Sequence, residues 1–71
     1  MNTLPMVVSV NGERRELATG TTLDRLVADL STAPSGVAAA VNEAVVPRSQ
    51  WAGTQLGDGD RVEVLTAVQG G

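Results

Sequence analysis

The sequence predicts a small α+β domain, in which one helix lies across one face of a mixed four- to five-stranded sheet. Three observations support this fold class: the dipeptide Asn11-Gly12 joins two β-rich runs, residues 23–30 have the apolar spacing of a helix, and residues 61–68 alternate as a strand does. With 71 residues there is room for a single domain, residues 1–71.

The N-terminal part of the chain predicts a β-hairpin. Residues 1–5 read as a loose leader, and residues 6–10 (Met-Val-Val-Ser-Val) are rich in β-branched side chains. Asn11-Gly12 tolerates the positive φ angles of a type I′ turn. Residues 13–17 are therefore expected to be the returning strand.

The middle of the chain predicts one amphipathic helix. Its apolar residues fall at positions i, i+3, i+4 and i+7: Leu23, Leu26, Val27 and Leu30. Residues 19–22 offer a hydroxyl cap, and Asp24 lies in the first turn, where the helix macrodipole favours an anion. Residues 31–36, with Pro34, are expected to end the helix.

Two short strands follow. Residues 37–41 (Val-Ala-Ala-Ala-Val) predict a buried strand whose small side chains let the helix approach closely. Residues 44–46 predict a second strand after a tight turn, and Pro47 stops it.

The C-terminal part predicts a connection, a turn and a last strand. Residues 48–53 connect the strands with about one helical turn, and residues 57–60 (Gly-Asp-Gly-Asp) form a turn. In the last strand one face is expected to carry Val62, Val64, Thr66 and Val68. With the last strand parallel to the first, this order of elements is the β-grasp, or ubiquitin-like, arrangement.

The composition argues against several classes of function. The net charge is −3, with five Arg and no Lys, and Trp51 is the only aromatic residue, so the chain lacks the charge and the stacking surface of a nucleic-acid-binding protein. The longest apolar run, residues 37–41, is too short to cross a bilayer, and no secretory signal is visible. The absence of Cys suits a reducing cytoplasm, which is the expected location.

The same composition leaves few groups for side-chain chemistry. Without Cys, His or Lys, the commonest nucleophile–base pairs, transition-metal sites and Schiff bases cannot be built. The chain is therefore expected not to be an enzyme.

The C-terminal tail, residues 67–71, is the remaining candidate, and it is expected to be flexible. Gly lacks a Cβ, so Gly70-Gly71 could thread a narrow channel of another protein, and the tail would reach at most about 17 Å. Adenylation by ATP would activate the carboxylate of Gly71, and a sulfur nucleophile could then displace AMP. Taken alone, the tail fits a frayed polar end equally well.

Several motifs resemble one known family. They are residues 7–13 (Val-Val-Ser-Val-Asn-Gly-Glu), 41–43, 46–51 (Val-Pro-Arg-Ser-Gln-Trp), 56–64 and 66–71. Together they resemble the sulfur carriers of bacterial thiamine biosynthesis, the ThiS family, over nearly the whole chain. Residues 46–51 point most narrowly to the thiamine branch.

The resemblance implies a pathway. A ubiquitin-activating-like adenylyltransferase, using ATP and Mg²⁺, would adenylate Gly71, and sulfur from a cysteine desulfurase would make a thiocarboxylate there. Thiazole synthase would receive the sulfur. Gly70, Gln69 and Val68 would line the partner's channel. No metal or cofactor is expected to be bound by the chain itself.

Three other functions remain open from the sequence. They are the small subunit of molybdopterin synthase, a protein modifier that conjugates Gly71 to lysines, and a plain β-grasp binding module.

Other residues carry weaker predictions. Asp58-Gly59-Asp60 is expected to be a turn and not a calcium loop, because the remaining ligands are missing. Arg14-Arg15 is expected to be a solvated pair of charges beside Glu13 and Glu16, with a basic contact patch as the alternative. Arg48 either caps or pairs locally, or contacts the adenylyltransferase. Trp51 is expected to pack in the core, with an exposed hot spot for a partner as the alternative. Val46 and Leu56 are candidates for a partner-facing patch.

Overall fold

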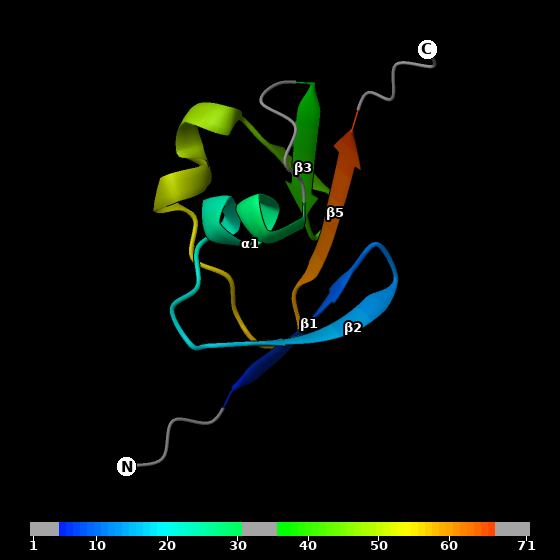
Figure 1. Cartoon of the computed structure of the whole chain (residues 1–71), viewed down its shortest axis with the longest axis vertical. Coiled ribbons are helices and arrows are strands. Elements are labelled where there is room, and N and C mark those ends of the chain that lie inside the picture. The colour runs from blue at the N-terminus through cyan, green and yellow to red at the C-terminus, as the bar shows by residue number, and fades with distance from the viewer. Residues whose placement is uncertain (1–4, 31–35, 67–71) are drawn as a thin grey trace.

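A computed structural model describes residues 5–30 and 36–66 of the chain. Its elements are, in order, β1 (Met6–Val10), β2 (Glu13–Leu17), α1 (Leu23–Leu30), β3 (Val37–Val41), β4 (Ala44–Val46), the 3₁₀ helix η1 (Arg48–Gly53) and β5 (Arg61–Thr66). Figure 1 shows α1 lying across one face of the sheet, beside β3 and β5. Most of the predicted leader and the whole predicted tail lie outside the described residues.

The strands form one five-stranded sheet in the order β2-β1-β5-β3-β4. β1 pairs with β5 in parallel, and the β1–β2, β3–β4 and β3–β5 pairs are antiparallel. The last strand therefore lies at the centre of the sheet and beside the first, which confirms the predicted β-grasp arrangement.

Two hairpin turns have positive φ angles at both of their central residues. Asn11 and Gly12 have φ angles of 51° and 87°, and Asn42 and Glu43 have φ angles of 51° and 73°. Positive φ at both central residues is the property of a type I′ turn, whose twist matches that of the flanking strands. Asn tolerates this region better than most residues, whereas Glu43 is held there without that advantage.

The helix buries its predicted face. Leu23 and Leu26 are fully buried, Val27 is buried, and Leu30 packs at the edge of the core. The Thr22 carbonyl accepts the amide of Leu26, but the Thr22 hydroxyl donates to the Asp24 side chain. The Thr22 hydroxyl thus bonds the carboxylate of Asp24 and not a backbone amide of the first turn. Thr22 therefore does not form the expected hydroxyl cap on the backbone.

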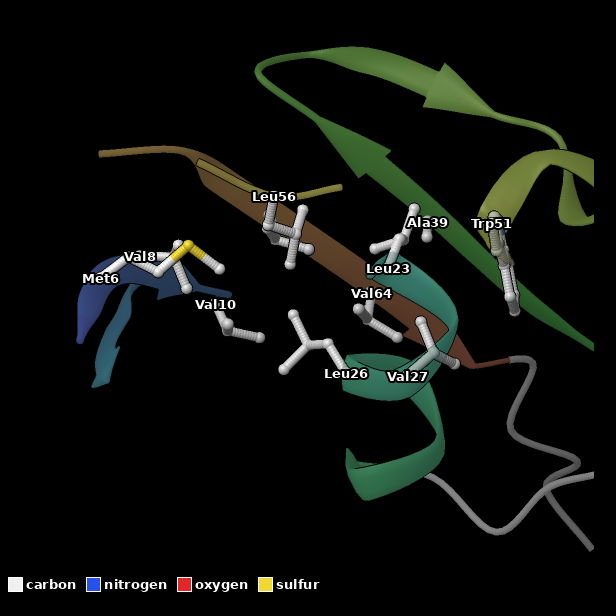
Figure 2. Packing of buried hydrophobic residues seen from close by; sticks show 11 residues of the cluster. Met6, Val8, Val10, Leu23, Leu26, Val27, Ala39, Trp51, Leu56 and Val64 are labelled. Carbon is white, nitrogen blue, oxygen red and sulfur yellow. The ribbon is translucent and has the colours of Figure 1, made fainter. Parts of the chain in front are cut away.

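The core lies between α1 and the inner face of the sheet, and it is almost wholly aliphatic. Figure 2 shows the helix side chains on the side of α1 that faces β5. The buried members are Met6, Val8, Val10, Leu23, Leu26, Val27, Ala39, Trp51, Leu56, Val62 and Val64. Alternate residues of β1 and β5 contribute to it, as expected where one sheet face is covered.

Two expectations about burial are wrong. The strand expected at residues 37–41 is present as β3, but it is only partly buried: Ala39 is buried and Val37 and Val41 pack at the edge of the core, whereas Ala38 is exposed. Val46 packs against the core and Leu56 is buried, so neither is part of an outer patch. Among residues 5–30 and 36–66, the large apolar side chains on the surface are instead Val45 and Leu65.

Candidate functional site

The predicted reacting group lies just past the described part of the chain. Val68, Gln69, Gly70 and Gly71 fall outside the described residues, which end with Thr66, the last residue of β5. The chain enters the tail directly from this strand. The contacts of β5 therefore determine where the tail leaves the domain.

β5 is held on both of its edges. On one edge it pairs in parallel with β1, at Ser9–Arg61 and Val10–Val62. On the other edge it pairs with β3 from Val41–Val62 to Val37–Thr66. Thr66, the last described residue of the strand, is thus held in the sheet by its pairing with Val37.

The side chain of Asn11 forms hydrogen bonds with β5 past Val10–Val62, where the backbone pairing of β1 with β5 ends. Its side-chain Nδ2 donates to the carbonyl of Val64 over 3.1 Å, and its Oδ1 accepts the amide of Val64 over 2.9 Å. A side-chain amide has one donor and one acceptor side, as the backbone does, so it can replace a strand residue here. The sequence predicted Asn11 only as a turn residue and did not indicate this contact.

Asn42, at the other hairpin turn, binds the start of β5 in a similar way. Its backbone amide donates to the Arg61 carbonyl over 2.7 Å, its Oδ1 accepts the Arg61 amide over 3.0 Å, and its Nδ2 donates to Asp60 over 3.0 Å. Both turn asparagines therefore fix the strand that leads to the tail.

The segment before β5 is a turn, as predicted. The Gly57 amide donates to an Asp60 carboxylate oxygen over 2.7 Å, and the Val7 amide donates to Asp58 over 2.7 Å. The two carboxylates are thus engaged with backbone amides of the fold. Among the described residues no group of three or more His, Cys, Asp or Glu side chains could hold a metal ion.

Trp51 is a packing residue, as predicted. It is buried, and its indole Nε1 donates to the Val46 carbonyl over 2.8 Å. Arg48 lies over the ring with its guanidinium carbon 5.5 Å from the ring centre. Arg48 therefore pairs locally, while Arg14 and Arg15 are exposed on β2.

The surface of the described part of the chain has a polar hollow and an apolar one. A polar one lies by the start of α1 and includes Thr21, Arg25 and Asp29. The other is an apolar groove of about 290 Å³ on the outer face of the sheet, next to the end of β5. It is lined by Ala38, Ala39, Ala40, Glu43, Val45, Glu63 and Leu65.

No helix of the described residues is long and apolar enough to span a membrane.

Comparison with known proteins gives consistent results. The model of the ThiS family matches residues 8–71. The sulfur carrier protein ThiS of Escherichia coli is 33% identical over 66 residues, which cover 93% of this chain and 100% of that protein. The crystal structure of the thiamine biosynthesis protein ThiS from Geobacter metallireducens matches with a TM-score of 0.76 and 30% identity, over 93% of this chain and 100% of that one.

The chain also resembles part of two larger proteins. It is 38% identical to a thiazole synthase of Magnetococcus marinus and 32% identical to one of Paramagnetospirillum magneticum, in each case over 66 residues. The match covers 93% of this chain but 20% of each synthase, so the chain corresponds to about a fifth of their length.

Proposed function

Because this chain belongs to the ThiS family, we propose that it carries sulfur on the C-terminal carboxylate of Gly71. The protein is a sulfur carrier of thiamine biosynthesis and serves the formation of the thiazole ring. It is a carrier on which other proteins act, and not an enzyme.

One observation supports Gly71 above other groups. The family match runs from residue 8 through residue 71, so it includes the glycines after β5 and is not confined to the folded sheet. The sequence also holds no Cys, His or Lys that could accept sulfur or an acyl group. The main-chain carboxylate is thus the group best suited to the chemistry.

The proposed activation proceeds in two steps. A carboxylate oxygen of Gly71 attacks the α-phosphorus of ATP, pyrophosphate leaves, and an acyl adenylate forms. A sulfur nucleophile then attacks the acyl carbon and AMP leaves. If the sulfur arrives as the persulfide of a cysteine desulfurase, a thiol must afterwards cleave the sulfur–sulfur bond, and a thiocarboxylate remains at Gly71.

The partners follow from this chemistry. We propose an adenylyltransferase of the ubiquitin-activating type, which uses ATP and Mg²⁺, and a cysteine desulfurase as the source of sulfur. Thiazole synthase accepts the sulfur, in agreement with the similarity of this chain to part of two such enzymes. Gly70, Gln69 and Val68 enter the partner's channel, where the missing Cβ of Gly70 allows close approach. The dependence on ATP and on a reduced sulfur donor supports a cytoplasmic location.

Intact-mass measurement tests the proposal. The chain is incubated with ATP, the adenylyltransferase and the sulfur source, and its mass is expected to rise by the difference between sulfur and oxygen. Omission of ATP and deletion of Gly71 are the matched controls, and both should abolish the change. An unmodified chain in the complete reaction would refute the proposal.

A second measurement separates this function from its rivals. A strain that lacks the protein is expected to grow when thiazole is supplied. Rescue by a molybdopterin source alone would identify a molybdopterin carrier, and conjugates on lysines of other proteins would identify a modifier.

A further inference from the structure

The outer edge of β2 is open. β2 is an end strand of the sheet, and among the described residues no other strand pairs with its outer edge. Residues 13–16 of this strand are all exposed, and Leu17 is half-buried. An unpaired strand edge presents a row of backbone amides and carbonyls that another strand can bind.

The bonding of β1 shows which backbone groups of β2 face this edge. The odd-numbered residues of β1 bond on the β5 side, as the Ser9 amide does when it donates to the Asp60 carbonyl over 3.0 Å. The even-numbered residues therefore bond β2, in the pairs Met6–Leu17, Val8–Arg15 and Val10–Glu13. Arg14 and Glu16 lie between these pairs, so their backbone amides and carbonyls point into the open edge.

The side chains on this edge carry charges of both signs. Arg14 and Glu16 lie on the outer face of the sheet, where their neighbours across β1 are Ser9 and Val7. Neither has an ion-pair partner among the described residues. Charges of a single sign on a strand edge repel a second copy, but β2 alternates Arg14 with Glu16 on one face and Glu13 with Arg15 on the other. The edge is therefore able to complement itself.

Symmetry restricts how a second copy can pair with β2. Two antiparallel copies of the strand in one continuous sheet are related by a two-fold axis perpendicular to the sheet, which keeps both helices on the same face. When this axis passes through Arg15, Arg14 of each copy lies opposite Glu16 of the other, and all of residues 13–17 are paired. Arg15 then faces its own equivalent, with Glu13 of each copy diagonally beside it.

The neighbouring registers are less favourable. An axis through Arg14 or through Glu16 brings two identical charges together at a hydrogen-bonded centre. Either axis also pairs fewer residues within the strands, residues 13–15 in the first case and 15–17 in the second. The register centred on Arg15 therefore gives the longest pairing and two facing pairs of opposite charge.

We propose that two copies of this chain associate through their β2 strands in the register centred on Arg15. The inference goes beyond the proposed function and does not depend on it. At each end of the contact, Arg14 of one copy and Glu16 of the other exchange backbone hydrogen bonds and form an ion pair. Glu13 of the second copy lies opposite Leu17, beside the polar hollow that Leu17 and Arg25 line. β1 stands between β2 and β5, so the contact does not involve the strand that leads to the tail.

Sedimentation equilibrium tests the inference. The wild type at low salt is expected to show a monomer–dimer equilibrium as its concentration rises to the millimolar range, and added salt is expected to weaken the dimer. Arg14→Glu and Glu16→Arg each place like charges opposite each other at both ends of the contact. Each variant alone should weaken the dimer at least tenfold, because two pairs change from attraction to repulsion. Circular dichroism confirms that the variants are folded.

Mixing the two variants separates a paired contact from a general effect of charge. In an equimolar mixture of Arg14→Glu and Glu16→Arg every facing pair has opposite charges, so a heterodimer is expected to form about as tightly as the wild-type dimer. The double variant, in which the two charges are exchanged, should also dimerise. Glu63→Arg is the matched control, since it makes the same charge change as Glu16→Arg on β5 and should dimerise as the wild type does.

The register has its own test. Arg15→Thr removes the facing pair of like charges and is expected to tighten the dimer several-fold. With the axis through Arg14, Arg15 would instead face Glu13, and the same change would weaken the dimer. Weakening by Arg15→Thr would therefore overturn the proposed register.

Three other results would overturn the inference itself. They are a wild type that stays monomeric at millimolar concentration, folded single variants that dimerise as the wild type does, and a mixture of the two variants that does not associate. Equal weakening by Glu63→Arg and Glu16→Arg would assign the effect to net charge and would also exclude the paired contact.

Discussion

The side-chain amide of Asn11 bonds both backbone groups of Val64, a residue 53 positions later in the chain. The contact ties the turn of the first hairpin to the strand that leads to Gly71. Asn11 also occupies a positive φ angle, so it serves the turn and the sheet at the same time.

Replacement of Asn11 separates these two contributions. Asn11→Gly keeps the positive φ angle accessible but removes both side-chain bonds, and we expect it to lower the free energy of unfolding by about 1–3 kcal/mol. Asn11→Ala should cost more, because the backbone strain is added. Urea denaturation measures both, and stability of Asn11→Gly equal to that of the wild type would show that the amide bonds contribute nothing.

Trp51 should stabilise the fold through the hydrogen bond of its indole nitrogen as well as through the apolar surface that its ring buries. Trp51→Phe keeps an aromatic ring but leaves the Val46 carbonyl without its donor, so a loss of about 1–3 kcal/mol is expected. Arg48→Ala, which removes only the cation over the ring, should cost about 0.5–1 kcal/mol. Denaturation followed by circular dichroism gives both values, and a larger effect at Arg48 would contradict this ranking.

Two glycines in the C-terminal half should respond oppositely to alanine. Gly59 has a φ of 89° and its amide donates to Val7, so Gly59→Ala is expected to destabilise by about 1–2 kcal/mol. Gly53 has no such φ angle and open space where a Cβ would lie, so Gly53→Ala should be neutral or slightly stabilising. Thermal unfolding compares them. Equal melting temperatures for the two variants would argue against a strained turn at Gly59.

Gly70 should affect sulfur loading and not folding. We expect Gly70→Ala to slow thiocarboxylation at least tenfold, a change of about 1.4 kcal/mol in the barrier, because a Cβ is added where a channel wall must approach. The unfolding midpoint should not change, since Gly70 lies beyond the paired residues of β5. The rate is followed by intact mass, with Gly53→Ala as control. Thiocarboxylation of Gly70→Ala at the wild-type rate would show that the missing Cβ of Gly70 is not needed in the partner's channel.

Local signals in the sequence predicted most of the fold. The Asn11-Gly12 turn, the helix stripe from Leu23 to Leu30 and the stop at Pro47 each depend on neighbouring residues, and the structure confirms them. The element order then favoured the β-grasp topology, which the parallel β1–β5 pair confirms.

The outer surface could not be predicted in the same way. β4 has three residues, so alternation alone does not tell whether Val45 or Val46 faces the core. Leu56 is buried outside any strand, where its amide bonds the Thr21 carbonyl over 3.0 Å. The contacts of Asn11 and Asn42 with β5 likewise join residues far apart in the sequence, which no local pattern indicates.

The central position of β5 has a mechanical consequence. A partner that holds the tail and moves away from the domain pulls β5 along its own axis, between β1 and β3. Such a force is shared by the hydrogen bonds on both edges of the strand, whereas the same force on an edge strand would be carried by the bonds of one edge. The strand that leads to the tail therefore resists being pulled out of the sheet, and an enzyme can release the tail without unfolding the domain.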